Sequence, residues 1–311
     1  MKRLKLGNLH YAISRLNEPS IAIEPGESVV VETEDTFIGM IKKLGDWKGA
    51  KIPWGNPLSG PIHVEGAEKG DMLAVEIKGI KPLTGQGATR VNVDGLLDIL
   101  NPTGLLDVEI PRKVWICPIK NEKVYWTKDI VLPYEPMIGT IGTAPEVEST
   151  MRAGPYGGNM DLTDLTIGNS LYLPVFVKGA LLHVGDVHAV QGDGELCGTA
   201  VEMPAEVTLT VGLIKNKTIG WPRIESPSHI MAVGSGRPME DAVRIAFREL
   251  ILWLHSEYGF DRLDAYNLCT QVSKIGVGYY LASVVAKFPK RLLERNLNTK
   301  PSYQVQGDMA Q

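Results

Sequence analysis

The chain has 311 residues, of which 44% are hydrophobic and 22% charged, with a formal net charge of −4 at pH 7. This composition is that of a globular protein that can bury a sizeable core, in one large domain or two. The small negative charge gives no electrostatic reason to expect nucleic acid or an anionic membrane surface as a partner, and we expect neither.

Cysteine usage and the N-terminus indicate the compartment. Cys117, Cys197 and Cys269 are odd in number and far apart, which argues against a secreted disulfide framework and against a Cys-x-x-Cys metal site. The first ten residues carry positive charge without the apolar stretch of a signal peptide. No window approaches the roughly 20 apolar residues that a membrane helix needs. We therefore expect a cytoplasmic protein.

The first two thirds of the chain have the pattern of β-strands. Residues 20–33 predict a strand, a Pro-Gly turn and a β-branched strand. Gly-Ala followed by Gly-Asp and a strand recurs at 64–77 and 177–190, and only the second of these adds histidines. Ordinary turn chemistry explains the earlier copies.

Short strands separated by Pro and Gly are expected between Leu96 and Pro145, for example at 114–118 and 123–126. The segment 136–145 is rich in glycine and poor in charge, so it should bring the backbone close to another part of the molecule. A glycine loop with Gly157 and Gly158 follows and ends at Asp161. This loop is either a plain tight turn or a nest of N–H groups for an oxyanion.

After a further strand at 202–214 the pattern changes to that of helices. Apolar residues recur at helical spacing from Ala242 to Leu254, Pro238 suits the first turn, and Gly259 ends the run. A second helix is expected from Asp261 to about Gln271, and a third short one after Pro289.

This order predicts an α+β, predominantly β fold, with an antiparallel β-sandwich-like core and a C-terminal helical segment packed on it. We expect residues 1–225 to form the mostly-β core, with two β subdomains possible at about 1–120 and 121–225. Residues 226–300 would form the helical segment, and residues 301–311 a frayed tail.

The densest polar cluster of the chain lies at residues 179–203, for which we expect a loop between two strands, with its glycines (Gly185, Gly192, Gly194) at positive φ. It holds nitrogen and oxygen donors of the kind that bind Zn²⁺: His183, Asp186, His188, Asp193 and Glu195. The two histidines are five residues apart and would face opposite sides of a strand. Both can bind one metal only if a turn at 184–186 reverses the chain, and a structural role for either stays open.

With these residues the sequence resembles the acetamidase/formamidase family of amide hydrolases over nearly the whole chain. The motifs that carry the resemblance are Asp35, Gly60 to Asp71, Gly-Gly-Asn-x-Asp at 157–161, Gly-Asp-x-His with Gln-Gly-Asp-Gly-Glu at 185–195, and Glu202. His183, His63 and Glu65 stand where formamidase members carry other residues. They are either structural or the mark of an acetamidase-like subset.

The resemblance implies hydrolysis of a small aliphatic amide, of the acetamide or formamide type, to a carboxylate and ammonia through a metal-activated water. The metal would be Zn²⁺, with Mn²⁺ or Ca²⁺ as alternatives. Its ligands would come from His188, Asp161, His183, Asp186 and Glu195. Glu195 or Glu202 would transfer the proton, and Asp193 and Asn159 complete the catalytic set. Gly157, Gly158, Asp35 and Gln191 would bind the substrate.

Three other functions compete with this one. Cys197 could act as a nucleophile with Glu195 and a lysine, as in nitrilase-type amidases. The chain could be a non-catalytic β-sandwich module that binds a metal or small ligand. A cupin-like oxidoreductase would need His-x-His, whereas this stretch has His-x₄-His. Exposed strand edges favour a homo-oligomer, a dimer foremost.

Overall fold

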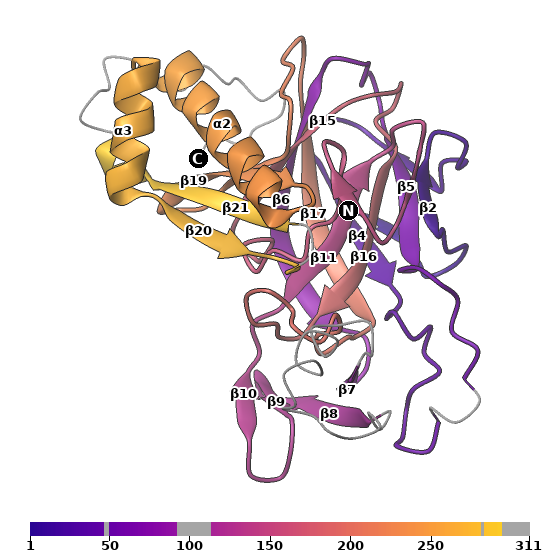
Figure 1. The fold of residues 1–311 in the computed structure, drawn as a ribbon. Coiled ribbons are helices and arrows are strands. Elements are labelled where there is room, and N and C mark those ends of the chain that lie inside the picture. The colour runs from indigo at the N-terminus through magenta and orange to yellow at the C-terminus, as the bar shows by residue number, and fades with distance from the viewer. Residues whose placement is uncertain (47–49, 92–112, 281–282, 294–311) are drawn as a thin grey trace.

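The computed structural model describes residues 1–46, 50–91, 113–280 and 283–293, and two large sheets dominate it (Figure 1). The larger sheet has nine strands in the order β1 (Lys2–Leu4), β4 (Glu27–Thr33), β17 (Ala205–Ile214), β6 (Met72–Pro82), β15 (Ser170–Pro174), β18 (Arg223–Glu225), β19 (His229–Ser235), β21 (Ser283–Pro289) and β20 (Lys274–Val277). Only β1 and β4 pair in parallel, and the other neighbours in this sheet are antiparallel.

The second sheet has six strands in the order β13 (Ala153–Gly154), β14 (Gly157–Asn159), β11 (Met137–Thr143), β16 (Leu182–His188), β5 (Leu58–Val64) and β3 (Ile21–Ile23). One apolar core joins the two sheets. It contains Leu73 and Val207 from the larger sheet and Ile138 and Val184 from the smaller one. The predicted sandwich-like, mainly antiparallel core is therefore confirmed.

Two small sheets complete the β structure. One has the order β10 (Val131–Pro133), β9 (Lys123–Tyr125), β8 (Val114–Lys120) and β7 (Gln86–Arg90), and its first three strands extend to the bottom of the view in Figure 1. The other pairs β12 (Val147–Ser149) with β2 (Ala12–Ser14). The strands expected at 114–118 and 123–126 are confirmed as β8 and β9, whereas the part of that expectation at 96–112 lies outside the described residues.

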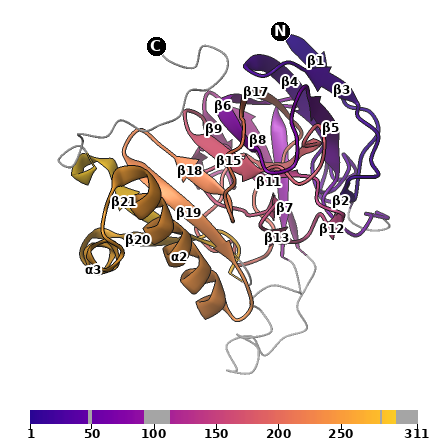
Figure 2. The ribbon, with the colours of Figure 1, turned by 90° about the horizontal axis from the view of Figure 1, so that it is seen from above.

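The C-terminal helices cover one end of the nine-stranded sheet. Figure 2 shows α2 (Met239–Tyr258) lying along β19 and β21, with α3 (Arg262–Val272) beside it. Helix α2 buries Ala246, Leu250 and Trp253 in an apolar cluster that includes Ile230 of β19 and Val284 of β21. The predicted packing of a helical segment on the β core is therefore confirmed.

Both helices begin and end where their capping residues predict. Gly259 adopts a left-handed conformation with φ of 70° directly after α2. The Asp261 carboxylate accepts hydrogen bonds from the N–H groups of Leu263 and Asp264 and so begins α3. After Pro289 the chain forms one short 3₁₀ helix, η2 (Lys290–Leu292), in place of an α-helix.

The division expected at residue 225 falls inside the larger sheet, because β18 pairs with β15 on one side and with β19 on the other. The expected frayed tail at 301–311 lies outside the described residues. None of the helices in the described ranges is long and apolar enough to cross a membrane.

The loop expected within residues 179–203 is confirmed after His188, where it joins β16 to β17, and is wrong before it, because β16 runs from Leu182 to His188. Pairing with β11 on one side and β5 on the other keeps this segment extended in the middle of its sheet. Of the three glycines expected at positive φ only Gly194 has it, at 92°, and within β16 it is Asp186 that adopts φ of 56°. Gly185 serves close packing, since a Cβ there would lie 2.5 Å from the Pro57 carbonyl oxygen.

A buried cluster of carboxylates and a histidine as candidate metal and active site

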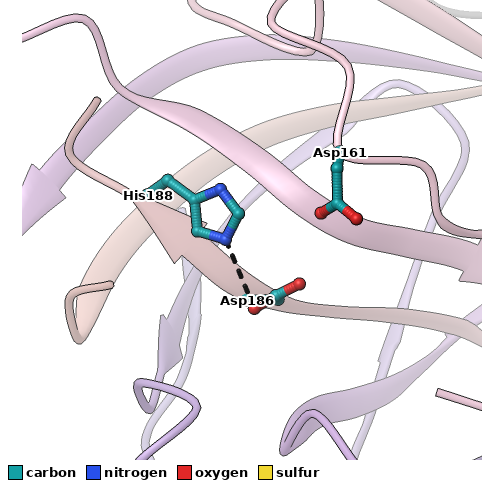
Figure 3. A group of neighbouring side chains, drawn as sticks. All are labelled: Asp161, Asp186 and His188. Carbon is teal, nitrogen blue, oxygen red and sulfur yellow. Dashed lines mark hydrogen bonds and ion pairs between the residues drawn. The ribbon is translucent and has the colours of Figure 1, made fainter. Parts of the chain in front are cut away.

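Four acidic or imidazole side chains come together near the C-terminal end of β16. Asp186 and His188 are two residues apart on β16, so both project to the same side of the strand. Asp161 follows β14, and Glu202 precedes β17 and forms a backbone bridge with His188. Each of the four is at most 4% exposed. Figure 3 shows the carboxylates of Asp161 and Asp186 and the imidazole of His188 pointing toward one another.

Two groups of possible metal ligands share His188. The ligand atoms of Asp161, Asp186 and His188 lie within 4.8 Å of one another, and the same holds for those of His188, Glu195 and Glu202. A nitrogen and several carboxylate oxygens at such spacing are a donor set for a divalent cation such as Zn²⁺ or Mn²⁺.

Gln191 fixes the orientation and the tautomer of His188. The Gln191 Nε2 donates to the backbone oxygen of Asp161 at 2.6 Å, so its Oε1 faces the His188 Nδ1 at 2.8 Å and accepts that proton. The His188 Nε2 then faces Asp186 Oδ1 at 3.4 Å and Glu202 Oε2 at 3.2 Å. A histidine that donates from one ring nitrogen and presents the other is the usual arrangement of a metal ligand.

A network of amides holds the aspartates in place. The Asn56 Nδ2 lies 2.6 Å from Asp186 Oδ2 and 2.8 Å from Asn159 Oδ1. The Asn159 Nδ2 donates to Asp161 Oδ2 at 2.7 Å, and the Thr140 hydroxyl lies 3.0 Å from Asp186 Oδ2. Each aspartate thus has one oxygen bound by the network, which leaves Asp161 Oδ1 and the Asp186 Oδ1 that faces His188 for another ligand.

Two buried oxygens of the cluster fit a cation. Among the described residues, Asp161 Oδ1 has no hydrogen-bond partner, and the contact of Glu202 Oε2 is the ion pair with His188 Nε2 at 3.2 Å. Leaving a buried carboxylate oxygen unpaired is costly, and a bound cation removes that cost. The residues present therefore fit a divalent metal, although the cluster alone does not identify the ion.

Burial and mutual repulsion shift the pKa values of the cluster. Burial, reinforced by neighbouring carboxylates, raises the pKa of Asp161 well above its ordinary value and raises that of Glu202. Burial also raises the pKa of Glu195 to about 8, against the opposing effect of His188. Burial alone would lower the pKa of His188, but Glu202 and Asp186 outweigh it and raise the pKa well above the ordinary value. Carboxyl groups with such shifts are candidates for proton transfer near neutral pH.

The cluster is open to solvent through a cavity of about 700 Å³. Asp186, Glu195 and Glu202 line it, together with Asn56 and Asn159 of the amide network. A substrate can therefore reach the carboxylates and the amides, which are otherwise buried.

His183 does not join the cluster. Its Nε2 lies 2.9 Å from the Asn17 Nδ2, its Nδ1 lies 2.9 Å from the Leu181 carbonyl oxygen, and its ring packs edge-on against His10. The chain does not reverse at 184–186, so His183 and His188 keep the opposite faces that their spacing on a strand gives them.

Three further sequence candidates also lie apart from the cluster. Asp193 is exposed and accepts a hydrogen bond from the Thr163 hydroxyl at 3.1 Å. His63 and Glu65 form a partly exposed pair at 3.7 Å, and a Cβ on Gly179 would clash with the His63 ring. Asp193, His63 and Glu65 therefore make these contacts outside the cluster.

Gly157 and Gly158 are required by the packing of β14. Their φ values are 92° and 87°, and a Cβ would lie 2.4 Å from the Ile141 carbonyl oxygen at the first and 2.2 Å from the Arg152 carbonyl oxygen at the second. Strand β14 pairs with both β11 and β13, and neither glycine is among the described residues that line the cavity.

Asp35 lies near Glu202 but holds a turn. Its Oδ1 accepts hydrogen bonds from the N–H groups of Phe37 at 2.8 Å and Gly39 at 3.1 Å. Burial raises the pKa of Asp35 to about 7, and repulsion from Glu34 and Glu202 contributes. Asp35 is not among the described residues that line the cavity, and its binding of substrate stays a prediction.

Sequence reasoning missed Asn56, Thr140 and Gly139. A Cβ on Gly139 would lie 2.7 Å from both Asp161 Oδ1 and Asp186 Oδ2, so this glycine makes room for both carboxylates. The glycine-rich segment 136–145 predicted that the backbone comes close to another part of the molecule, but it did not predict that this part is the pair of carboxylates. Asn56 and Thr140 stand in no motif, and only the pairing of distant segments shows their contacts.

Comparison with known proteins agrees with this geometry. A model of the Acetamidase/Formamidase family matches residues 10–154 and 146–286. A crystal structure of an acetamidase from Yersinia enterocolitica shares 42% identity, with 92% of this chain and 89% of that chain covered and a TM-score of 0.86. An acetamidase from Bacillus halodurans shares 30% identity over 95% of this chain and 99% of its own, also with a TM-score of 0.86.

A formamidase from Methylophilus methylotrophus is 28% identical over 64% of this chain and 62% of its own length. The chain therefore spans less than two thirds of the length of the curated relatives that it matches.

Proposed function

The chain belongs to the acetamidase/formamidase family, and on that premise we propose that it is an amidase that cleaves the C–N bond of a linear amide. The products would be a carboxylate and ammonia. The observation that carries the proposal is the buried cluster beside the cavity, where Asp186 and Glu202 face the Nε2 of His188 and Asp161 Oδ1 has no hydrogen-bond partner among the described residues.

We propose that His188, Asp161 and Asp186 hold a divalent cation, with Glu195 or Glu202 as a further ligand. Such an ion, Zn²⁺ foremost and Mn²⁺ or Ca²⁺ as alternatives, would polarise the amide carbonyl and acidify a water molecule. Gln191 keeps the proton of His188 on Nδ1 and so reserves Nε2 for the ion.

Proton transfer falls to Glu195 and Glu202, both of which line the cavity. One of them would take the proton of the attacking water and deliver it to the leaving nitrogen. A carboxyl group whose pKa is about 8, as at Glu195, exchanges a proton readily near neutral pH. Asn56 and Asn159 keep the aspartates fixed, so that the site does not reorganise during the reaction.

The test is ammonia release from formamide and acetamide by the purified protein, as isolated, after chelation, and after reloading with Zn²⁺ or Mn²⁺. We expect release to disappear on chelation and to return with metal. The His188→Ala variant should lose both bound metal and turnover, while a control at an exposed histidine, His255→Ala, should keep both. Full activity in His188→Ala would remove the metal mechanism.

Two other functions make different predictions in the same assay. Turnover that persists after chelation would favour Cys197 as the nucleophile. Cys197 lies exposed on its loop. Partial burial of the thiol, and to a smaller extent repulsion from Glu195, raise the pKa of Cys197, which disfavours the reactive thiolate. Metal binding without ammonia release from any amide would favour a binding module. The homo-oligomer expected from exposed strand edges remains a prediction.

A further inference from the structure

Three arginines line the same cavity as the carboxylates of the cluster. Arg90 ends β7, Arg152 precedes β13, and Arg237 follows β19, so segments far apart in the sequence converge there. Arg90 packs over the Phe37 ring at 5.7 Å. Among the described residues, no carboxylate lies within ion-pair distance of Arg152 or Arg237. The lining of the cavity therefore combines the carboxylates of Asp186, Glu195 and Glu202 with three guanidinium groups.

The volume of the cavity exceeds what a formamide or acetamide molecule needs. About 700 Å³ corresponds to roughly 20 water molecules in the liquid, at about 30 Å³ each. A cavity of this size has room for a ligand that carries a second functional group in addition to its amide.

We propose that the amide cleaved at this site carries a carboxylate on its acyl side, as in the half-amide of a short dicarboxylic acid. Arg152 and Arg237 bind that carboxylate, and the carbamoyl group lies at the cluster. Guanidinium groups suit this role because their planar donors match both oxygens of a carboxylate. The inference rests on the proposed amidase function.

The charge distribution also orients such a substrate. Arg152 and Arg237 attract the carboxylate of such a substrate by their charge. A carboxylate held by these two residues leaves the carbamoyl group at the other end of the molecule, where it can reach the cluster. A neutral amide of the same size lacks this constraint.

The reaction needs no further co-reactant. The C–N bond of the carbamoyl group breaks, water supplies the hydroxyl to the carbon and a proton to the nitrogen, and the new carboxylic acid gives its proton to the released ammonia. No atom changes its oxidation state. The products are the dicarboxylate and ammonium.

The test compares two amides on the metal-loaded protein. Succinamate, the half-amide of succinic acid, carries the charge, and 4-methylpentanamide is a neutral amide of similar size. We expect kcat/KM for succinamate to be higher by about tenfold or more at low salt, and this advantage to shrink as ionic strength rises. The double variant Arg152→Gln and Arg237→Gln should lower the ratio of the two kcat/KM values by about tenfold, mainly through KM for succinamate.

Arg244→Gln is the matched control, because Arg244 lies on the exposed face of α2 with 74% of its side chain exposed. The ratio of kcat/KM for succinamate to kcat/KM for 4-methylpentanamide should be the same in Arg244→Gln as in the unchanged protein. Equal kcat/KM for the two amides, or a ratio that the double variant does not lower, would overturn the inference and leave the amidase function intact.

Absence of turnover with every amide would instead overturn the proposed function. Calorimetric titration with succinamate then decides the inference by itself. Binding that the double variant loses and Arg244→Gln retains supports the anion site, and absence of binding to the unchanged protein refutes it.

Discussion

Gly139→Ala tests the arrangement of the two aspartates with the smallest possible change. Gly139 lies in β11, and its carbonyl oxygen accepts hydrogen bonds from the N–H groups of Met160 and Asp161, which fix its backbone against the segment that carries Asp161. A Cβ there would lie 2.7 Å from Asp161 Oδ1, 2.7 Å from Asp186 Oδ2 and 2.8 Å from the Asp186 carbonyl oxygen. Ordinary contact begins at 3.4 Å, so both carboxylates must move by about 0.7 Å.

The expected magnitudes follow from that displacement. Gly139 does not have a positive φ, so alanine is tolerated by the backbone, and the whole effect comes from the crowded oxygens. Forcing a methyl group into a packed interior costs about 1–3 kcal/mol of unfolding free energy. Disturbed orientation of metal ligands lowers metal affinity or activity by roughly 10–100-fold.

The assay combines urea unfolding, metal titration and ammonia release on the same preparations. Gly79→Ala is the matched control, because Gly79 also lies in a strand, β6, and its Cβ would meet no atom closer than 3.8 Å. The free energy of unfolding of Gly79→Ala should equal that of the unchanged protein or exceed it by up to about 1 kcal/mol. Metal affinity and kcat/KM in Gly139→Ala that match those of the unchanged protein would refute the proposed role of Asp161 and Asp186.

Three further predictions concern single side chains. Gln191→Leu should weaken metal binding by roughly 10–100-fold, because the His188 Nδ1 loses its acceptor; unchanged affinity in a metal titration would contradict this. Burial lowers the pKa of the His183 imidazole from 6.5 to about 4. On acidification the unfolded chain therefore takes up this proton at a higher pH than the folded protein does. The free energy of unfolding falls by up to about 3 kcal/mol as the pH drops from 6.5 toward 4. The urea midpoint of His183→Asn should therefore fall less between pH 6.5 and pH 4 than that of the unchanged protein. An equal fall in both proteins would contradict this prediction. Cys197→Ser should retain full ammonia release, and loss of activity in that variant would return the thiol mechanism to consideration.

Local sequence signals determined the two helices and several strands, among them β4, β8, β9 and β17. Gly259 and Asp261 mark the end of α2 and the start of α3 because left-handed φ and side-chain capping are properties of single residues. The five-residue spacing from His183 to His188 already contained the separation that the structure shows, because side chains alternate between the faces of a strand.

The sequence failed where a residue's environment comes from another strand. The Gly157-Gly158 pair looked like an anion nest, yet its glycines are explained by carbonyl oxygens of residues on β11 and just before β13. The loop expected at 184–186 is a strand, because pairing with β5 and β11 overrides the local preference of glycine and aspartate for turns.

The sequence by itself determined the family, the mainly β fold with its C-terminal helices, and the residue types of the candidate site. Which of those residues meet was decided only by the tertiary structure. The cluster of Asp161, His188 and Glu202 forms because β14, β11 and β16 are neighbours in one sheet and because Glu202, before β17, forms a bridge with His188 at the end of β16. Asn56 joins it through its hydrogen bond to Asp186. Such contacts depend on strand register and sheet packing, which join residues more than a hundred positions apart and leave no trace in the spacing of either segment.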